Sequence, residues 1–225
     1  MPVTVTDPGP DGRIGSADDG GGVTAYNLSS DALNTPPVNL TTNLPDANSE
    51  YYTWEITAIK RQTARWSLLA SFTETWSREA ALTAGGGFTP NALVNSDGDQ
   101  DHFKTWQVNV NGTMDLPAGF RVVPVLRHQS GTPFARTFVQ ALNYGSAIIK
   151  AEPFVNRTPN ITLLDVRTEK TFRLSRVRLT GFFDVYNVFN TNAAQALTTS
   201  SGGSWLRPTT ITGPRILRIG ARVDW

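Results

Sequence analysis

The 225-residue sequence contains no cysteine, so it can form neither a disulfide nor a thiolate metal site. It also contains no run of about 18 or more apolar residues, which excludes a membrane-spanning helix. Charge is scarce and balanced, with 20 Lys and Arg against 19 Asp and Glu, and this predicts no nucleic-acid partner. The two histidines, His102 and His128, stand in no recognisable catalytic motif. We therefore expect a protein that is not an enzyme.

The clearest pattern that is present is a strict alternation of residue types at the end of the sequence. From Leu217 to Trp225 every odd position is apolar and every even position is not. Side chains of a β-strand point alternately to its two faces, so this segment has one face for an apolar medium and one for water. Strands of outer-membrane β-barrels have this pattern because lipid covers one side and a polar lumen the other.

The same alternation recurs upstream and predicts about seven antiparallel strands. The residues between these strands form short and long connections in turn. Short connections are predicted at Arg61–Arg65, Asp115–Gly119 and Arg173–Arg176, and long ones at Arg78–Phe103, Gln140–Asn160 and Thr191–Gly213. If the strands run up and down, all short turns lie at one end, as in outer-membrane barrels. The predicted strands are Tyr52–Lys60, Trp66–Trp76, Thr105–Met114, Phe120–Phe138, Leu163–Phe172, Val177–Phe189 and Leu217–Trp225, and Val23–Leu28 is a candidate eighth.

Period-2 alternation is also typical of a soluble or secreted β-sandwich used for binding or adhesion, so that alternative stays open. A small barrel of eight strands is a further alternative, if Val23–Leu28 pairs with the last strand. Two features favour a membrane barrel: one face is highly charged, and aromatic residues are expected near the short-turn ends of the other. Those aromatic residues are Trp66, Trp106, Phe120 and Trp225.

Several segments resemble TonB-dependent outer-membrane transporters. Asp165–Phe172 followed by Phe183–Asn190 is similar to the family's "D-x-R-x-x-K-x-F" and "D-V-x-N-x-F-N" strands, which precede a last strand that ends in an aromatic residue. Gln129–Phe134 resembles the "Q-S-G-x-P-[FY]" found a few strands earlier. Asp7–Gly12, with the following acidic pair, resembles an external loop of the Oar-like subgroup.

The resemblance implies an all-β chain that forms part of an up-and-down transmembrane β-barrel. Residues 1–50 would be an external loop region with an Asp/Gly-rich turn, and residues 51–225 the C-terminal strands. Such barrels have about 22 strands around a plug domain, so we expect an incomplete barrel that cannot transport alone. The sequence opens without the basic start and apolar stretch of a signal peptide, so an exported protein would have its N-terminus further upstream.

The resemblance also implies a location and partners. The location is the outer membrane of a Gram-negative bacterium, with its lipid bilayer around the barrel. The plug domain and the remaining strands of a full-length protein would complete the barrel, and the TonB complex would act only through the missing N-terminal part. The transported ligand is not predicted.

The resemblance also implies that the barrel-assembly machinery recognises the last strand. Recognition could occur by strand addition, because an exposed strand edge offers free backbone N–H and C=O groups. The alternative is that the last strand is an ordinary edge strand of a soluble sheet. On the opposite face, charged residues are expected to point into a lumen, where they either contact a ligand or plug or form a cross-strand ladder of opposite charges. The assembly residues are Leu217, Ile219, Gly220, Ala221, Val223 and Trp225; the lumen-facing ones are Asp165, Arg167, Glu169, Arg178, Asp184, Arg218 and Arg222.

Two acidic loops are candidate calcium sites, because calcium binds 6–8 oxygen ligands and glycines in these loops permit tight turns. The alternative for both is a solvated loop in which Asp, Asn and Gly are the ordinary turn residues. No other cofactor is expected. The first loop offers Asp7, Asp11, Asp18 and Asp19, and the second Asn95, Asp97, Asp99 and Asp101.

Overall fold

The computed structural model describes residues 1–36, 38, 48–82 and 89–225. The chain is all-β and its sheets are antiparallel, as the alternation predicted. Its main element is a seven-stranded sheet in the order β15-β12-β11-β6-β5-β4-β3. The strands of this sheet are β3 (Glu50–Thr63), β4 (Trp66–Ala80), β5 (Gln100–Leu116), β6 (Phe120–Gln129), β11 (Ile161–Leu174), β12 (Val177–Tyr186) and β15 (Ile216–Asp224).

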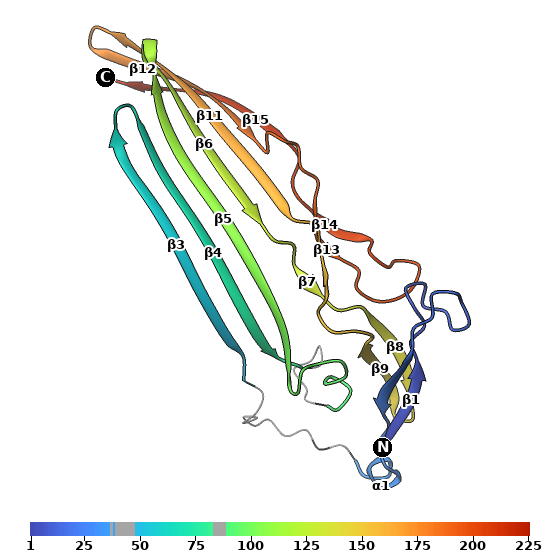
Figure 1. Ribbon diagram of the computed structural model, residues 1–225. Coiled ribbons are helices and arrows are strands. Elements are labelled where there is room, and N and C mark those ends of the chain that lie inside the picture. The colour runs from blue at the N-terminus through green and yellow to red at the C-terminus, as the bar shows by residue number, and fades with distance from the viewer. Residues whose placement is uncertain (37, 39–47, 83–88) are drawn as a thin grey trace.

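Short turns join these strands at one end of the sheet, and long connections lie at the other (Figure 1). Ala64 and Arg65 between β3 and β4 have φ values of 48° and 74°, and such positive values at both central positions suit a tight hairpin. The 3-10 turn Pro117–Gly119 joins β5 to β6, and Ser175 with Arg176 joins β11 to β12. The expected separation of short turns from long connections is confirmed.

The two long connections between β6 and β11 and between β12 and β15 carry small two-stranded sheets of their own. These elements gather at the long-connection end together with the N-terminal hairpin and the short helix α1 (Figure 1). They pair as β1-β2, β8-β9, β13-β14 and β7-β10. Their bounds are β1 (Pro2–Thr6), β2 (Gly22–Tyr26), α1 (Ser30–Leu33), β7 (Pro133–Phe134), β8 (Thr137–Leu142), β9 (Gly145–Lys150), β10 (Asn156–Arg157), β13 (Ala194–Leu197) and β14 (Pro208–Ile211).

The main cluster of buried apolar residues lies among these loop elements, and among the described residues Ile161 at the start of β11 is the one buried large apolar residue of the large sheet. Ala25 of β2, Phe138 of β8, Ile149 of β9 and Val94 form one cluster. This packing joins segments far apart in sequence, because burial of apolar surface stabilises their contact. The loops therefore have a core of their own beside the sheet.

Two strand predictions are wrong. The long strand expected over Phe120–Phe138, with interruptions at Pro124 and Pro133, ends at Gln129, and the chain then leaves the large sheet to form β7 and β8 elsewhere. The strand Val177–Phe189 ends at Tyr186. The candidate eighth strand does form, as β2, but it pairs with β1 and not with the last strand. The pairing on which an eight-stranded barrel depends is therefore not made.

Candidate functional site

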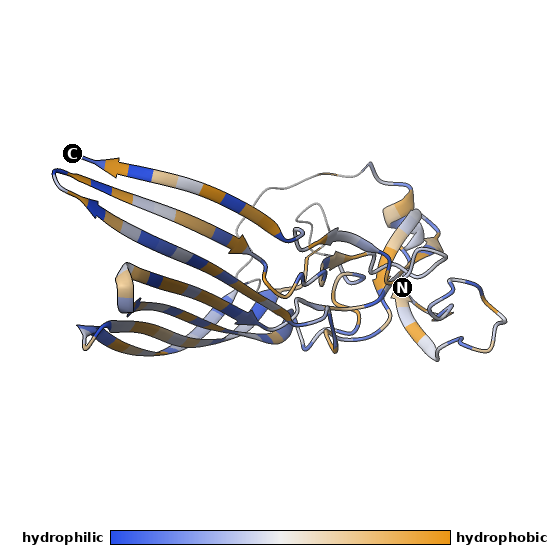
Figure 2. Ribbon diagram, turned by 90° about the horizontal axis from the view of Figure 1, so that it is seen from above, coloured by the Kyte–Doolittle hydropathy of each residue, from blue (hydrophilic) through white to orange (hydrophobic). Residues whose placement is uncertain are grey.

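The seven-stranded sheet has one apolar and one polar face, and its register keeps them continuous from strand to strand. For example, Val166, Val185 and Leu217 are direct neighbours across β11, β12 and β15. Figure 2 shows the alternation of apolar and polar residues along the strands. We call the side that carries these three residues the apolar face and the opposite side the polar face.

The apolar face is exposed rather than packed against a second layer, which differs from the arrangement of a water-soluble sheet, although β3 and β15 at the sheet edges are exposed on both faces. Ile219 and Leu217 are 83% and 62% exposed, whereas Thr180 and Asp184 on the polar face are 4% and 3% exposed. Burial of apolar surface is a main stabilising force in water, so a sheet covers its apolar side when water surrounds it. Exposed large apolar residues occur along all strands of this face: Trp54, Ile56, Trp66, Trp76, Met114, Leu116, Phe120, Phe172, Leu174, Phe183, Leu217, Ile219 and Val223.

Aromatic residues lie towards both ends of the apolar face. Trp66 and Phe120 lie beside the short turns, as expected. Trp106 does not: it lies near the other end of β5, where its backbone pairs with Ser130 and its ring packs on His128 at 4.9 Å. The prediction for Trp106 is wrong because the short turn follows the end of β5 at Leu116, whereas Trp106 lies towards the start of the strand, which begins at Gln100.

Three charged residues at the centre of the polar face form a cross-strand ladder. Arg167, Asp184 and Arg218 are direct neighbours across β11, β12 and β15. Arg167 donates to both oxygens of Asp184, at 2.6 and 3.0 Å, and Arg218 Nε donates to Asp184 Oδ2 at 2.7 Å. Such charge-assisted hydrogen bonds hold the three strands together. This is the ladder of opposite charges that the sequence suggested, and it satisfies these three residues without a ligand.

An aromatic ring lies on the polar face between the two arginines of this ladder. The Phe182 ring centroid lies 4.6 Å from Cζ of Arg167 and 5.7 Å from Cζ of Arg218. Phe182 is the register partner of Gly220, and its ring occupies the space that a side chain on Gly220 would need. Gly220 therefore has a packing role, and its role in assembly stays a prediction.

The asparagines of Phe183–Asn190 end β12 and connect it to its neighbours. Asn187, with φ of 52°, donates its backbone N–H to Asp165 at 2.8 Å and its side-chain amide to the Gly213 carbonyl at 2.8 Å. Asn190 accepts the backbone N–H of Arg215 at 3.0 Å. Asparagine tolerates the left-handed conformation and offers both donor and acceptor groups. The motif thus fixes where β12 turns away and β15 begins, and Asp165 has a structural partner.

The Gln129–Phe134 motif marks the point where the chain leaves the large sheet. Ser130 Oγ accepts the backbone N–H of Trp106 at 3.2 Å, which completes the pairing of β5. A Cβ on Gly131 would lie 1.6 Å from the carbonyl oxygen of Thr158, so only glycine fits at this crossing. The motif is explained by backbone packing.

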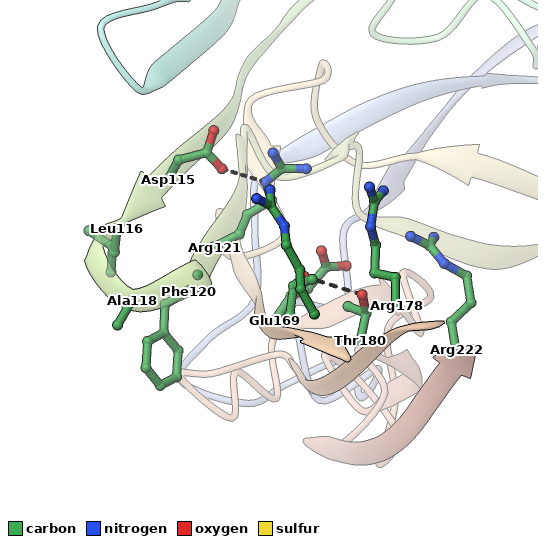
Figure 3. Close-up of a pocket in the computed structure, with 12 residues that line it drawn as sticks. Asp115, Leu116, Ala118, Phe120, Arg121, Glu169, Arg178, Thr180 and Arg222 are labelled. Carbon is green, nitrogen blue, oxygen red and sulfur yellow. Dashed lines mark hydrogen bonds and ion pairs between the residues drawn. The ribbon is translucent and has the colours of Figure 1, made fainter. Parts of the chain in front are cut away.

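At the short-turn end the polar face carries a pocket of about 660 Å³ (Figure 3). Figure 3 shows Arg121 beside Asp115, with Arg178 and Arg222 alongside one another. Arg121 Nε lies 2.6 Å from Asp115 Oδ1. The pocket therefore combines an internal ion pair with further arginines. Its charged lining residues are Asp115, Arg121, Glu169, Arg173, Arg178 and Arg222.

The structure brings together the sequence-predicted Glu169, Arg178 and Arg222 in this pocket, with two arginines that sequence reasoning missed. Arg173 was placed in a turn, although β11 extends to Leu174, and Arg121 was not singled out. In the β11-β12 hairpin, Leu174 pairs with Val177 next to the turn, so Arg173 pairs with Arg178. Arg173 could have been found from this spacing in the sequence.

The first acidic loop uses its carboxylates within the protein. Asp7 forms a buried two-pronged ion pair with Arg136, one contact of which measures 2.7 Å. This hydrogen bond raises the pKa of Arg136 above its ordinary value. Asp18 Oδ2 accepts the backbone N–H of Asp11 at 3.1 Å, and Asp19 Oδ2 accepts that of Gly15 at 2.6 Å.

In the second acidic loop, Asp101 pairs with Lys150 at 2.5 Å, and Asp97 lies 3.2 Å from Nδ1 of His102. Over the described residues, no group of three or more acidic, histidine or cysteine side chains is arranged to hold a metal ion. Calcium binding stays a prediction for both loops.

Comparison of the chain with protein-family models, with curated proteins and with solved structures gives no match in any of the three. In the described ranges, no helix is long and apolar enough to cross a membrane. The function is therefore inferred from the arrangement of this chain's own residues.

Proposed function

We propose that this chain is a wall section of an outer-membrane β-barrel in a Gram-negative bacterium. The observation that carries the proposal is the exposed apolar face opposite a polar face whose central charges are paired. A bilayer covers such a face without any second protein layer, whereas water does not. Aromatic residues towards both ends of the apolar face suit the two membrane interfaces.

Strand dimensions support the same proposal. The strands of the large sheet are between 9 and 17 residues long, and a tilted strand needs about 9–11 residues to cross a bilayer. Short turns at one end and folded connections at the other fit periplasmic turns and external loops.

The outer edges of β15 and β3 carry no partner strand in the described part of the chain. Unpaired backbone groups are costly in lipid, so we propose that further strands complete the barrel at these edges. The motif resemblance supports a TonB-dependent, Oar-like transporter as the complete protein. In that protein the present residues would supply wall, external loops and assembly strand, and ligand uptake would require the plug and the TonB complex.

The β-sandwich alternative predicts a second sheet over the apolar face. The described residues place no such sheet there: the small hairpins gather at one end (Figure 1), and the apolar side chains stay exposed. No observation favours the sandwich over the membrane barrel.

The absence of cysteine permits a direct test. Val110→Cys and Asn109→Cys are adjacent in β5 and lie on opposite faces. Each variant, refolded in detergent micelles that contain nitroxide lipids, would be labelled with a polarity-sensitive fluorophore. We expect nitroxide lipids to quench the label at position 110 strongly and a water-soluble quencher to reach only the label at position 109.

Equal quenching at the two positions, or protection of position 110 from both quenchers, would contradict the proposal. The second result is the one that a sandwich predicts. Ile219→Cys and Arg218→Cys on β15 form a second matched pair, so that a local disturbance of β5 does not decide the outcome.

A further inference from the structure

Two arginines face each other without a counter-charge at the short-turn end of the polar face. Arg173 of β11 and Arg178 of β12 are register partners. Within the part of the chain that the structure describes, neither guanidinium forms an ion pair or a hydrogen bond. Like charges directly opposite across two strands repel each other. The pair therefore weakens the hairpin unless an anion lies between or beside its members.

The acidic residues of the same pocket are already engaged. Asp115 pairs with Arg121 at 2.6 Å, and Glu169 lies 3.6 Å from Nη1 of Arg167. Arg222, a neighbour in the pocket, contacts only the exposed Asp224, at 3.2 Å. The pocket therefore has an excess of positive charge that its own carboxylates do not balance.

Hydroxyl groups lie between the arginines. Thr171 and Thr180 are register partners two residues away from the arginine pair on the same strands, and their Oγ1 atoms are 3.2 Å apart. Thr180 pairs in turn with Arg222. Figure 3 shows Thr180 between Glu169 and the two arginines Arg178 and Arg222. Guanidinium forks and hydroxyl donors together are the groups that bind phosphate oxygens.

We propose that this pocket binds a phosphate-bearing anion through Arg173, Arg178 and Arg222. A phosphate group carries up to about two negative charges and three acceptor oxygens, which matches the unpaired guanidiniums of Arg173 and Arg178 and the exposed guanidinium of Arg222, whose one ionic contact is Asp224. The pocket volume of about 660 Å³ accommodates a phosphate group together with the small molecule that carries it. The site depends on the register of β11, β12 and β15 and not on what covers the apolar face.

The test uses the full chain refolded in detergent micelles and inorganic pyrophosphate as the probe, followed by isothermal titration calorimetry. We expect saturable binding that weakens at least about tenfold in Arg178→Gln and in Arg173→Gln, because one charge-assisted contact is worth about a factor of ten or more. The matched control is Arg215→Gln, which removes one exposed arginine at the far end of β15 and leaves binding unchanged. Near-ultraviolet circular dichroism checks that each variant is folded.

A stability measurement gives an independent readout. Without pyrophosphate, Arg178→Gln is expected to raise the unfolding midpoint by removing the repulsion. Pyrophosphate is expected to raise the midpoint of the original chain but not that of the variant. Micelles that contain phosphatidic acid form a separate arm: competition by this lipid would assign the phosphate to a headgroup, and its absence to a soluble ligand.

The proposal would be overturned by any of three results: no saturable binding to the folded original chain, the same weakening in Arg215→Gln, or sulfate and chloride at matched ionic strength replacing pyrophosphate equally well. The last result would indicate general charge screening and no site.

Discussion

The ring of Phe182 lies where a side chain of Gly220 would be: a Cβ built on Gly220 would approach the ring Cζ to 2.3 Å. The two residues are register partners on β12 and β15. Since the ring also contacts the guanidiniums of Arg167 and Arg218, moving it aside would disturb both contacts.

Gly220→Ala is therefore expected to lower the free energy of unfolding by about 1–3 kcal/mol, the usual cost of overpacking. Urea unfolding of the chain in micelles, followed by tryptophan fluorescence, measures this. The matched control is Gly181→Ala in β12, because a Cβ there meets nothing within 4 Å. Equal losses in the two variants would show that the ring does not determine the need for glycine.

The double variant Gly220→Ala, Phe182→Leu separates packing from recognition. Removing the ring should restore part of the lost stability. If the assembly machinery reads Gly220 itself, membrane insertion in cells stays impaired in the double variant. Recovery of both properties together would indicate that Gly220 acts through packing alone.

The ladder centred on Asp184 gives a second prediction. Asp184→Asn removes the acceptor charge that Arg167 and Arg218 share, and we expect a loss of about 1–3 kcal/mol, the range for hydrogen bonds to charged groups. Asp224→Asn is the control, because Asp224 is exposed and contacts one arginine at 3.2 Å. The unfolding assay used for Gly220 compares them, and a larger loss in Asp224→Asn would contradict the assigned role.

The buried pair Asp7–Arg136 attaches the N-terminal hairpin to the loops. The two residues are 5% and 8% exposed, and Arg136 also donates to Ser201 at 2.9 Å. Asp7→Ala leaves a buried charge without its partner, so we expect a loss of about 3–5 kcal/mol in the local stability of the loops. Hydrogen exchange of the β1-β2 amides measures this loss.

The double variant Asp7→Ala, Arg136→Ala should be less disturbed than Asp7→Ala alone, because it contains no unpaired buried charge. Arg13→Ala, an exposed arginine of the same loop, serves as the control. If the double variant exchanges faster than Asp7→Ala, the ion pair is not what holds the hairpin.

Asp18 gives a prediction on pH. Its hydrogen bond from Ser16, at 2.5 Å, lowers its pKa below the ordinary value of 3.8. A carboxyl with a lowered pKa stabilises the folded loop above its unfolded pKa and loses this contribution as the pH falls through the folded value. Ser16→Ala should shift the titration of Asp18 towards higher pH, as measured by carboxyl NMR. Titration at an unchanged pH would contradict the assigned cause.

The large sheet could be predicted because the residue pattern within each strand is enough to identify the strand and its two faces. In β12 and β15, apolar and polar residues alternate within each strand, and a slip of one residue would reverse the faces, so pattern and register agree. The tight turn at Ser175 could likewise be placed between two alternating runs.

The loops could not be predicted, because distant residues determine them. Phe120–Phe138 reads as one strand, yet the chain breaks at Ser130 since Gly131 must pass the carbonyl of Thr158. The pairing of β2 with β1 depends on a shared core with Phe138 and Ile149, which no single segment reveals. Of the arginine pair at the short-turn end, the sequence predicted Arg178 but not Arg173, because Arg173 belongs to a strand that is longer than its alternation suggests.

The Phe182–Gly220 contact has a consequence for errors during assembly. Alternation rejects a shift of β15 by one residue, because Arg218 and Arg222 would then lie on the apolar face. Alternation does not reject a shift by two, which keeps every side chain on its own face. Such a shift would set Phe182 against a long arginine side chain instead of the glycine, and it would separate Asp184 from Arg218. The Phe182 ring and the absence of a side chain on Gly220 thus favour one register of β15 on β12 over the registers shifted by two residues.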